Sequence, residues 1–278
     1  VWTADFRGRL YSATAGFSPQ GPDIAKGLLQ FYRGKPLGER GLYWLKVHGA
    51  NRYGYDKEDY DKRVAWVDER HDQFLSAAND PLSYRDVWSG ADKPFQFLAF
   101  LFEYRRVFEL AALGYDTREF ISNLPIGLDG SCNGLQNLSA CLRDAVGGRA
   151  TNLVPQPKPA DIYTEVATVC RDKVRTDTSP LGKLWNDYMD TAMQGTISRG
   201  TAKRPVMTLP YGATRNSCTK YVFLSILETE NKFFPANFKA ACHLTPLLGT
   251  SIGEVVVAAR EAMDWLQKAA TVISKENA

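Results

Sequence analysis

The residue with the clearest potential for chemistry is an aspartate at the end of an apolar run. Asp129 follows Pro-Ile-Gly-Leu at 125–128 and precedes the small residues Gly130 to Gly134. Two-metal phosphoryl transfer uses carboxylates held on rigid elements, and small neighbours let a nucleotide approach. The alternative is that Asp129 caps the helix that should follow it. The spacing alone favours the cap over a metal-binding role.

A second group combines two basic residues with a tyrosine. Arg199 and Lys203 are four residues apart, so on a helix their side chains point the same way. Two such cations could hold a triphosphate and stabilise the charge that develops at the transferred phosphorus. Tyr211 would lie about 12 Å farther along the helix axis, where its ring could stack on a base and its hydroxyl could meet the ribose. A basic helix with a half-buried tyrosine explains these residues equally well.

The stretch from Arg199 to Leu227 is basic throughout. It contains no Asp or Glu, and its cations are Arg199, Lys203, Arg204, Arg215 and Lys220. Such a segment is either a solvated basic face, which is the commoner case, or a surface that contacts phosphate. The net charge of +3 is too small to favour nucleic acid by itself.

Weaker candidates lie earlier in the chain. Arg7 and Arg9 alternate within the segment 5–11, and on a strand they would face one side, as in a strand that contacts a nucleic-acid backbone. A salt-bridged surface strand is the stronger interpretation. Lys46 and His48 stand close together in a predicted helix. A lone histidine is more often structural than catalytic, so we assign His48 no role.

The elements that must position these residues are predicted to be mostly helical. Apolar residues at helical spacing predict the helices, and the apolar run before Asp129 predicts a short buried strand that ends at the carboxylate. A Pro-rich segment should form a hinge or boundary. A capping-box pattern should start the last helix, whose core face would carry Val255, Ala259, Ala262, Met263, Leu266 and Ala270. The predicted segments are strand and loop up to Gly21, helices at 22–32, 41–49, 52–78, 95–113 and through 135–142, the strand at 125–128, the boundary at 155–159 and the capping box at 251–254.

The cysteines and the apolar content limit the class of protein. Five cysteines without a CxxC pair argue against a disulfide framework and a zinc site, and they favour a reducing compartment. No apolar run approaches the roughly 20 residues of a membrane span. The start at Val1 has neither a signal-peptide pattern nor an initiator methionine, so we expect the chain to begin within a longer protein. Its 278 residues suit one large domain or two closely packed ones.

Taken together, these segments resemble the single-subunit RNA polymerases of bacteriophages, mitochondria and chloroplasts. The run DGSCNGLQ that starts at Asp129 resembles motif A of that family, and RGTAKRPVMTLPYG, which starts at Arg199, resembles motif B. Four further runs match in the family's order, namely DFRGRLY at 5–11, WLKVHGAN at 44–51, LRDAVGGR at 142–149 and EAMDWL at 261–266. The resemblance covers nearly the whole chain. The runs HGAN at 48–51 and AVGGRATNL at 145–153 are closer to phage members than to organellar ones.

The resemblance implies a fold and an activity. The fold would be helix-rich α/β (α+β) with the right-hand polymerase architecture: a palm with a small sheet at 1–157, which carries a helical insertion at about 34–119, and mostly helical fingers at 158–278. The activity would be DNA-directed RNA synthesis by a two-metal mechanism with Mg²⁺ as cofactor. The partners would be a DNA template, an RNA transcript and nucleoside triphosphates. We expect a monomer without membrane contact, in the cytoplasm of a phage-infected bacterium or, as the alternative, in a mitochondrion.

The resemblance also implies roles for matching residues. Asp129 and the backbone carbonyl of Gly130 would bind Mg²⁺, and Arg199 and Lys203 would hold the incoming triphosphate. Asp129, Lys203 and Tyr211 would be the catalytic residues, with Tyr211 selecting ribose over deoxyribose and Gly212 near the template base. The substrate path would also be lined by Arg9, Lys46 and Tyr163, and nucleic acid would be contacted by Arg7, Arg9, Arg143 and Arg204.

Two features depart from the family's pattern. The family's motif C, a His-Asp pair that supplies the second metal-binding carboxylate, would lie beyond the last helix of this chain. We likewise expect the N-terminal promoter-reading domain to lie outside this sequence. We therefore expect the isolated chain to be inactive. Pro205 and Pro210 stand inside the supposed motif B helix, where a proline costs about 3 kcal/mol. Either the helix begins near Lys203, with Pro205 in its first turn, or it is kinked before Tyr211.

Two other functions stay open at this point. A related DNA polymerase shares the Lys-x7-Tyr-Gly spacing, but it would carry a Glu close behind the motif A aspartate. Here the first Glu after Asp129 is Glu165, and the small residues between them leave room for a ribose 2′-hydroxyl. Without a second carboxylate, the chain could instead be an inactive module that binds nucleic acid.

Overall fold

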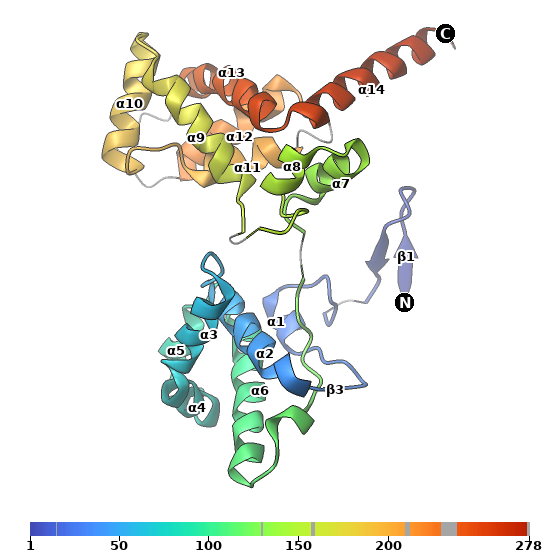
Figure 1. Cartoon of the computed structure of the whole chain (residues 1–278), viewed down its shortest axis with the longest axis vertical. Coiled ribbons are helices and arrows are strands. Elements are labelled where there is room, and N and C mark those ends of the chain that lie inside the picture. Colours follow the sequence, from blue (N-terminus) through green and yellow to red (C-terminus); the bar gives the residue numbers. More distant parts are fainter. Residues whose placement is uncertain (15, 129, 157–158, 209–211, 229–237, 277–278) are drawn as a thin grey trace. The chain divides into compact units, whose positions relative to one another are not determined.

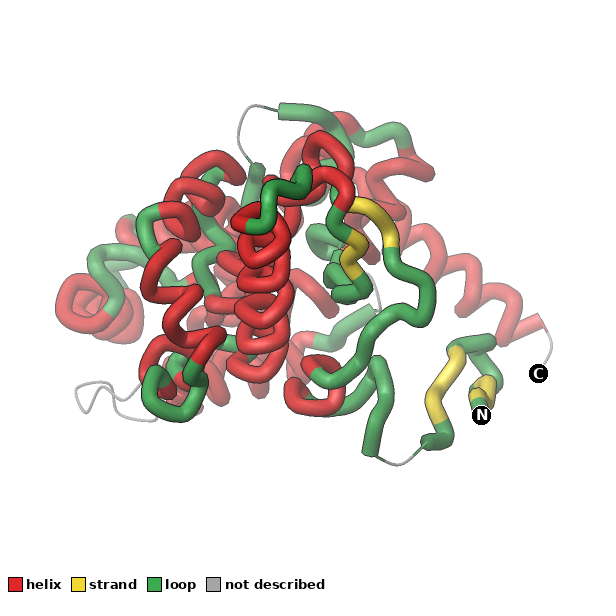
Figure 2. The backbone as a smooth tube through the Cα atoms, turned by 90° about the horizontal axis from the view of Figure 1, so that it is seen from below, coloured by secondary structure: helices red, strands yellow, loops and turns green. Residues whose placement is uncertain are grey.

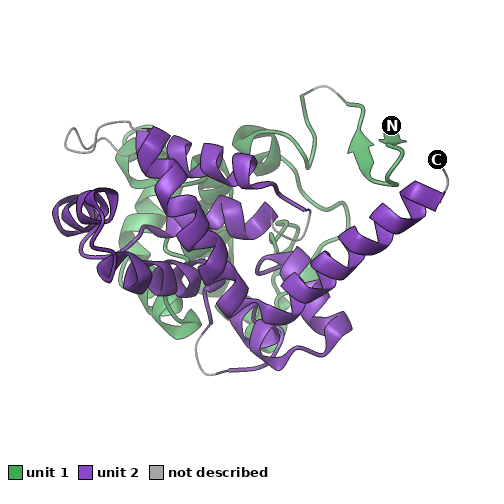
Figure 3. Ribbon diagram, turned by 90° about the horizontal axis from the view of Figure 1, so that it is seen from above, with its two compact units in different colours: residues 1–128 green, residues 129–278 purple. Residues whose placement is uncertain are grey.

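The computed structural model describes residues 1–14, 16–128, 130–156, 159–208, 212–228 and 238–276. The chain divides into two compact units, Val1–Leu128 and Asp129–Ala278 (Figures 1 and 3). Helices predominate and the strands are short (Figure 2). The helix-rich class with a small amount of sheet is therefore confirmed, while the division into palm and fingers at residue 157 stays a prediction.

The first unit begins with a β-hairpin. Strands β1 (Trp2–Ala4) and β2 (Leu10–Ser12) pair antiparallel. Between them Gly8 has a φ of +76°, a left-handed conformation that glycine adopts without strain. The Asp5 carboxylate accepts hydrogen bonds from the amides of Arg7 and Arg9 and forms an ion pair with the Arg7 guanidinium. Arg7 thus lies in the turn and Arg9 directly before β2, so the predicted strand with both side chains on one side is wrong.

The remainder of the first unit is a helical cluster built around one long helix. Its elements are α1 (Asp23–Gly27), β3 (Lys35–Pro36), α2 (Gly38–Tyr53), α3 (Tyr60–Asp68), α4 (His71–Asn79), α5 (Arg85–Ser89), α6 (Pro94–Ala112), the 3-10 helix η1 (Thr117–Glu119) and β4 (Ile121–Ser122), which pairs antiparallel with β3. The apolar face of α6 is buried and includes Phe97, Phe100 and Tyr104. Gly49 of α2 faces the Phe100 ring, and a Cβ at this position would lie 2.4 Å from it. Close packing of α2 on α6 therefore requires glycine here.

The second unit is all helical in its described part. It consists of α7 (Asn133–Leu142), α8 (Ala145–Ala150), α9 (Ile162–Arg175), α10 (Pro180–Ala192), α11 (Arg199–Thr208), α12 (Arg215–Glu228), α13 (Phe238–Val255) and α14 (Val257–Glu276). Its core is a single apolar cluster that contains fully buried Trp185, Met189 and Leu244. Helix α9 packs against both α11 and α13. Side-chain caps at the helix starts include Asp144 for α8, Asp161 for α9 and Ser179 for α10.

Most predicted helices are confirmed. The helix at 41–49 is the centre of α2, the helix at 95–113 is α6, and the helix through 135–142 is α7. The predicted helix at 22–32 is reduced to α1, and the segment 52–78 is helical as predicted, with the end of α2 followed by α3 and α4. Helices α2 to α6 and η1 all fall within the predicted helical insertion at 34–119.

Three further local predictions are wrong. Residues 125–128 form no strand, and Leu128 is 94% exposed, because the only pairing in this region is made earlier, by Ile121 and Ser122 with β3. Ser251 to Glu254 lie inside α13 and cap nothing; the Ser251 hydroxyl donates to the Leu247 carbonyl. Helix α14 begins after a sharp bend and buries Ala259, while Leu266 of the predicted core face is 47% exposed.

The bend between α13 and α14 measures 108°. Among the described residues, no single helix has the length and apolar content to cross a membrane, and these two helices meet that criterion only when taken as a bent pair.

Candidate active site

Helix α11 carries the two cations expected to hold phosphate. It starts at Arg199, where the Ser198 hydroxyl accepts a hydrogen bond from the Thr201 amide as a helix cap. Arg199 and Lys203 therefore lie on one helix at i, i+4 spacing, as predicted. The opposite face, which includes Ala202 and Val206, is buried in the core of the second unit. This packing leaves the Lys203 side chain exposed.

Pro205 does not end or begin this helix. It is buried at the seventh position of α11, so the predicted start near Lys203 is wrong. A proline at this position cannot donate to the Thr201 carbonyl one turn earlier. The Thr201 hydroxyl instead joins α11 to α12 through the Ser225 hydroxyl, at 2.9 Å. Tertiary packing thus outweighs the local cost of the proline, and Pro210 lies outside the described residues.

Arg199 is held by α9. Its Nε donates to Asp161 Oδ2 at 2.5 Å, and its guanidinium carbon lies 4.8 Å from the centre of the Tyr163 ring. Asp161 is the N-cap of α9, and its Oδ1 accepts a hydrogen bond from the Tyr163 amide. Burial alone would raise the pKa of Asp161, but hydrogen bonds from Arg199 and Thr164 outweigh it and hold that pKa below its usual value. The Asp161 carboxylate is therefore charged at neutral pH.

Tyr163 links this pair to the loop that follows Asp129. Its side chain is 8% exposed and lies near the thiol of Cys132. Burial, and then the neighbouring Cys132 thiol, raises the pKa of Tyr163, so its hydroxyl stays protonated. Cys132 has a φ of +53° and stands at the N-cap position of α7 without a side-chain cap bond. Asp129, for which the sequence left open the alternative role of helix cap, stands three residues before that position in the sequence.

Hydrogen bonds of Asn152 and Gln136 also hold the loop that follows Asp129. Asn152, with a φ of +59°, donates from Nδ2 to the Ser131 hydroxyl and to the Ala160 carbonyl, and its Oδ1 accepts from the Ala160 amide. Gln136 Nε2 donates to the Thr151 carbonyl at 2.9 Å. The loop after Asp129 and the start of α9 are therefore fixed to each other by side-chain hydrogen bonds.

Two of the predicted catalytic residues, Asp129 and Tyr211, lie outside the described residues. Gly212, next to Tyr211, has a φ of +72°, which explains why a glycine stands there. Gly130, the predicted carbonyl ligand, is described and lies close to Gln136, whose Oε1 would be 3.3 Å from a Cβ at Gly130. The described residues contain no group of three His, Cys, Asp or Glu side chains that could hold a metal ion. On their own they do not complete a two-metal site.

The other predicted substrate and nucleic-acid contacts are distributed over both units. In the second unit, Arg204 pairs with Glu228 at 3.6 Å, and Arg143 is exposed at the end of α7 with a φ of +56°. In the first unit, Lys46 forms an ion pair with Asp68 at 2.5 Å and its side chain is only 14% exposed. This pair ties α2 to α3. The substrate and nucleic-acid roles of all these residues stay predictions.

The chain contains one His-Asp dipeptide, His71–Asp72. It precedes Asp129 in the sequence, whereas the family's motif C would follow the last helix. His71 starts α4, its Nδ1 lies 2.9 Å from the Tyr104 hydroxyl, and its ring packs at 4.6 Å on Phe108. Its place in the packing of the helical cluster is that of a structural histidine. His243 pairs with Asp177, Nε2 to Oδ2 at 2.7 Å, and thereby joins α13 to the segment before α10.

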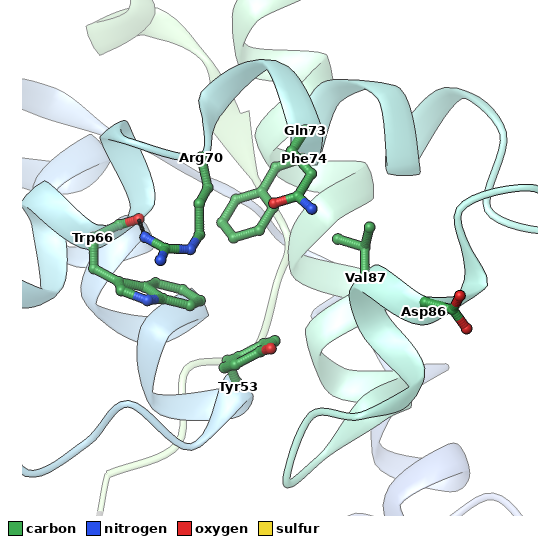
Figure 4. A pocket seen from close by; sticks show the side chains of 7 residues that line it. All are labelled: Tyr53, Trp66, Arg70, Gln73, Phe74, Asp86 and Val87. Carbon is green, nitrogen blue, oxygen red and sulfur yellow. Dashed lines mark hydrogen bonds between the residues drawn. The ribbon is translucent and has the colours of Figure 1, made fainter.

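The first unit has a pocket of about 160 Å³ (Figure 4). It is lined by Tyr53, Trp66, Arg70, Gln73, Phe74, Asp86 and Val87. The Arg70 guanidinium lies 4.6 Å from the Trp66 ring and donates to the Trp66 carbonyl, so this cation is already engaged. None of the predicted site residues that the structure describes lines this pocket.

Sequence reasoning missed three residues that organise the site. Asp161 holds Arg199, Cys132 lies near Tyr163, and Asn152 fixes the loop after Asp129. The only available signal was local: Asp161 precedes a helical run, which is typical of an N-cap. Its pairing with Arg199 spans 38 residues and depends on the packing of α9 on α11.

Comparison with known proteins supports the resemblance. The family model described as DNA-dependent RNA polymerase matches residues 35–278. T7 RNA polymerase of Escherichia phage T7 is 36% identical over 307 aligned residues, which cover 99% of this chain and 33% of that protein. The DNA-directed RNA polymerase of Enterobacteria phage K11 is also 36% identical, over 99% of this chain and 32% of its own length.

A mitochondrial protein is similar to the same extent. The mitochondrial DNA-directed RNA polymerase of Mus musculus is 37% identical over 97% of this chain and 22% of its own length. The chain thus spans about a third of the length of the phage relatives and about a fifth of the mitochondrial one. The family match extends over most of the chain and includes the runs that start at Asp129 and at Arg199. The chain therefore belongs to the phage-type, single-subunit family of DNA-dependent RNA polymerases.

Proposed function

We propose that this chain supplies part of the active site of a DNA-directed RNA polymerase, which adds ribonucleotides to an RNA 3′ end on a DNA template. The carrying observation is the arrangement on α11. Arg199 and Lys203 stand one turn apart, and Lys203 is exposed and makes no ion pair with a residue that the structure describes. An exposed cation next to an arginine fork is suited to bind a triphosphate.

In the proposed reaction, the RNA 3′-hydroxyl attacks the α-phosphorus of a nucleoside triphosphate in line, and pyrophosphate leaves. Arg199 and Lys203 bind the β- and γ-phosphates and offset the negative charge that accumulates on the leaving group. Tyr211 stacks at the base and contacts the ribose. Asp129 and the Gly130 carbonyl would contribute to holding Mg²⁺, which when bound lowers the pKa of the attacking hydroxyl and neutralises charge. We propose that a second carboxylate, as the family resemblance implies, completes the ligand set.

The test of this proposal is triphosphate binding by Lys203→Ala with Lys220→Ala as matched control. Lys220 is also an exposed lysine of the acid-free stretch, one helix farther on. Titration calorimetry with inorganic triphosphate should show at least about a tenfold weaker affinity for Lys203→Ala, since a charge-assisted hydrogen bond contributes about 1.5–3 kcal/mol. Lys220→Ala should stay within about twofold of the unaltered chain. Equal losses of triphosphate affinity in both variants would mean that α11 offers only a generally basic surface and no specific phosphate site.

Activity assays separate the alternatives. The isolated 278 residues should show no Mg²⁺-dependent primer extension, and measurable extension would mean that the acids within them suffice. In the full-length polymerase, Asp129→Asn should abolish extension while template binding persists, because the change removes a metal ligand and no phosphate contact. Preference of that enzyme for deoxynucleotides over ribonucleotides would favour the DNA polymerase alternative. We propose a monomer that works in the cytoplasm of a phage-infected bacterium.

A further inference from the structure

The hydrogen bonding of Arg199 leaves one edge of its guanidinium open. Asp161 accepts from Nε alone, and the structure describes no other hydrogen bond of this side chain. The two terminal nitrogens therefore keep their four N–H groups, which form the fork that binds a phosphate or carboxylate through two parallel hydrogen bonds. An acid that competed with phosphate for this arginine would be expected at the fork, where two bonds are available, and not at Nε.

The groups that hold Arg199 are themselves fixed. Asp161 Oδ1 accepts from the Tyr163 amide at 3.1 Å and Oδ2 accepts from the Thr164 hydroxyl at 3.0 Å, so the carboxylate is anchored to the first turn of α9. The Tyr163 ring, 4.8 Å from the guanidinium carbon, is almost fully buried. One face and one edge of the guanidinium thus rest on rigid neighbours, and its side chain remains 38% exposed.

We propose that Asp161 is a positioning residue for triphosphate binding, which fixes the Arg199 guanidinium through Nε so that both terminal nitrogens are ready for phosphate before the nucleotide arrives. This inference rests on the proposed function of Arg199. An arginine that is ordered in advance loses less side-chain entropy on binding. The negative charge of Asp161 opposes phosphate binding, so the experiment must separate orientation from charge.

Three variants make that separation. Asp161→Ser keeps a good N-cap for α9 but is too short to reach Arg199 Nε. Asp161→Asn removes the charge and keeps an acceptor oxygen at the same distance. Glu165→Gln, one turn farther along α9, removes the same charge from an exposed residue that makes no ion pair with a described residue. All are prepared in the full 278-residue chain and titrated with inorganic triphosphate by calorimetry.

The orientation of Arg199 predicts a definite order of affinities. Asp161→Ser should bind inorganic triphosphate about 2- to 13-fold more weakly, the factor that corresponds to ordering one flexible side chain on binding. Asp161→Asn should restore binding to within about twofold of the unaltered chain, and Glu165→Gln should not weaken it. In the Asp161→Ser background, Arg199→Ala should cause a smaller loss of triphosphate affinity than in the unaltered chain, because an arginine that is not oriented in advance contributes less to binding. A merely structural role of Asp161 would leave the loss on Arg199→Ala unchanged.

The outcomes distinguish the two levels of the argument. If Arg199→Ala weakens triphosphate binding but Asp161→Ser binds as tightly as the unaltered chain, or more tightly, the positioning role is refuted and the proposed function stands. If the unaltered chain does not bind triphosphate, or Arg199→Ala does not affect it, the proposed function itself fails. Circular dichroism establishes that each variant is folded, and Asp161→Thr, which also caps helices, replaces the serine variant if that one does not fold.

Discussion

Lowering the pH from 7 to 5 should destabilise the first unit through His48. This side chain is 3% exposed on α2. Burial and the nearby Arg52 guanidinium lower the pKa of His48 from 6.5 to about 3. The folded unit thus keeps His48 neutral, while the unfolded chain takes up a proton below about pH 6.5. The stability contributed by neutral His48 is complete above that pH and declines as the pH falls, by about 2 kcal/mol between pH 7 and pH 5.

The assay compares the unaltered chain with His48→Gln, whose side chain does not titrate. Urea unfolding at pH 7 and pH 5 gives the loss of unfolding free energy in each protein. Other groups also titrate in this range, but they are common to both proteins. The difference between the two losses therefore isolates His48. The loss of unfolding free energy between pH 7 and pH 5 should be about 2 kcal/mol smaller in the variant. The variant is expected to be less stable at pH 7, and that offset does not enter the comparison.

A second measurement observes the proton directly. The chain has three histidines, so its NMR spectrum should hold three ring resonances, and the one lost in His48→Gln belongs to His48. That resonance should not titrate between pH 7 and pH 5 in the folded chain. A His48 resonance with a midpoint near 6.5, or an equal pH dependence of stability in both proteins, would refute the argument from burial.

Further predictions concern packing and thiol chemistry. Gly49→Ala should destabilise the first unit by about 1–3 kcal/mol in urea unfolding, because its Cβ would overlap the Phe100 ring, whereas Gly249→Ala, with open space around the new Cβ, should not destabilise the second unit. An unfolding midpoint for Gly49→Ala equal to that of the unaltered chain would contradict the close contact. Trp185→Phe should cost about 1–3 kcal/mol, since it removes the buried hydrogen bond to the Ala240 carbonyl at 3.1 Å. Iodoacetamide should label exposed Cys141 first and Cys170 last, because burial raises the pKa of Cys170 to about 12; mass spectrometry of the labelled peptides would reveal any other order.

What could be predicted from the sequence depended on the range of the interaction. The i, i+4 relation of Arg199 and Lys203 follows from the helical period alone, and α6 could be recognised from the spacing of its apolar residues. The strand expected at 125–128 failed because an apolar run forms a strand only where a partner strand is available. Ser251 and Glu254 fit a capping box in sequence, but the core packing of α13 continues through them, so the helix does not begin there.

The free charge of the basic stretch also could not be predicted from the sequence, because it depends on acids that are distant along the chain. This has a functional consequence. The sequence from Arg199 to Leu227 contains five cations and no acid, which suggests a surface with five free positive charges. The fold supplies acids from elsewhere: Asp161 engages Arg199 and Glu228 engages Arg204. Lys203, Arg215 and Lys220 make no ion pair with a described residue. The salt dependence of phosphate binding should therefore reflect fewer charges than the sequence contains, because an arginine that already has a carboxylate partner releases less counterion from the nucleic acid or nucleotide that it meets. For Arg199 this reduction accompanies a gain in orientation, so the contribution of this residue to binding lies more in the direction of its hydrogen bonds than in its net charge.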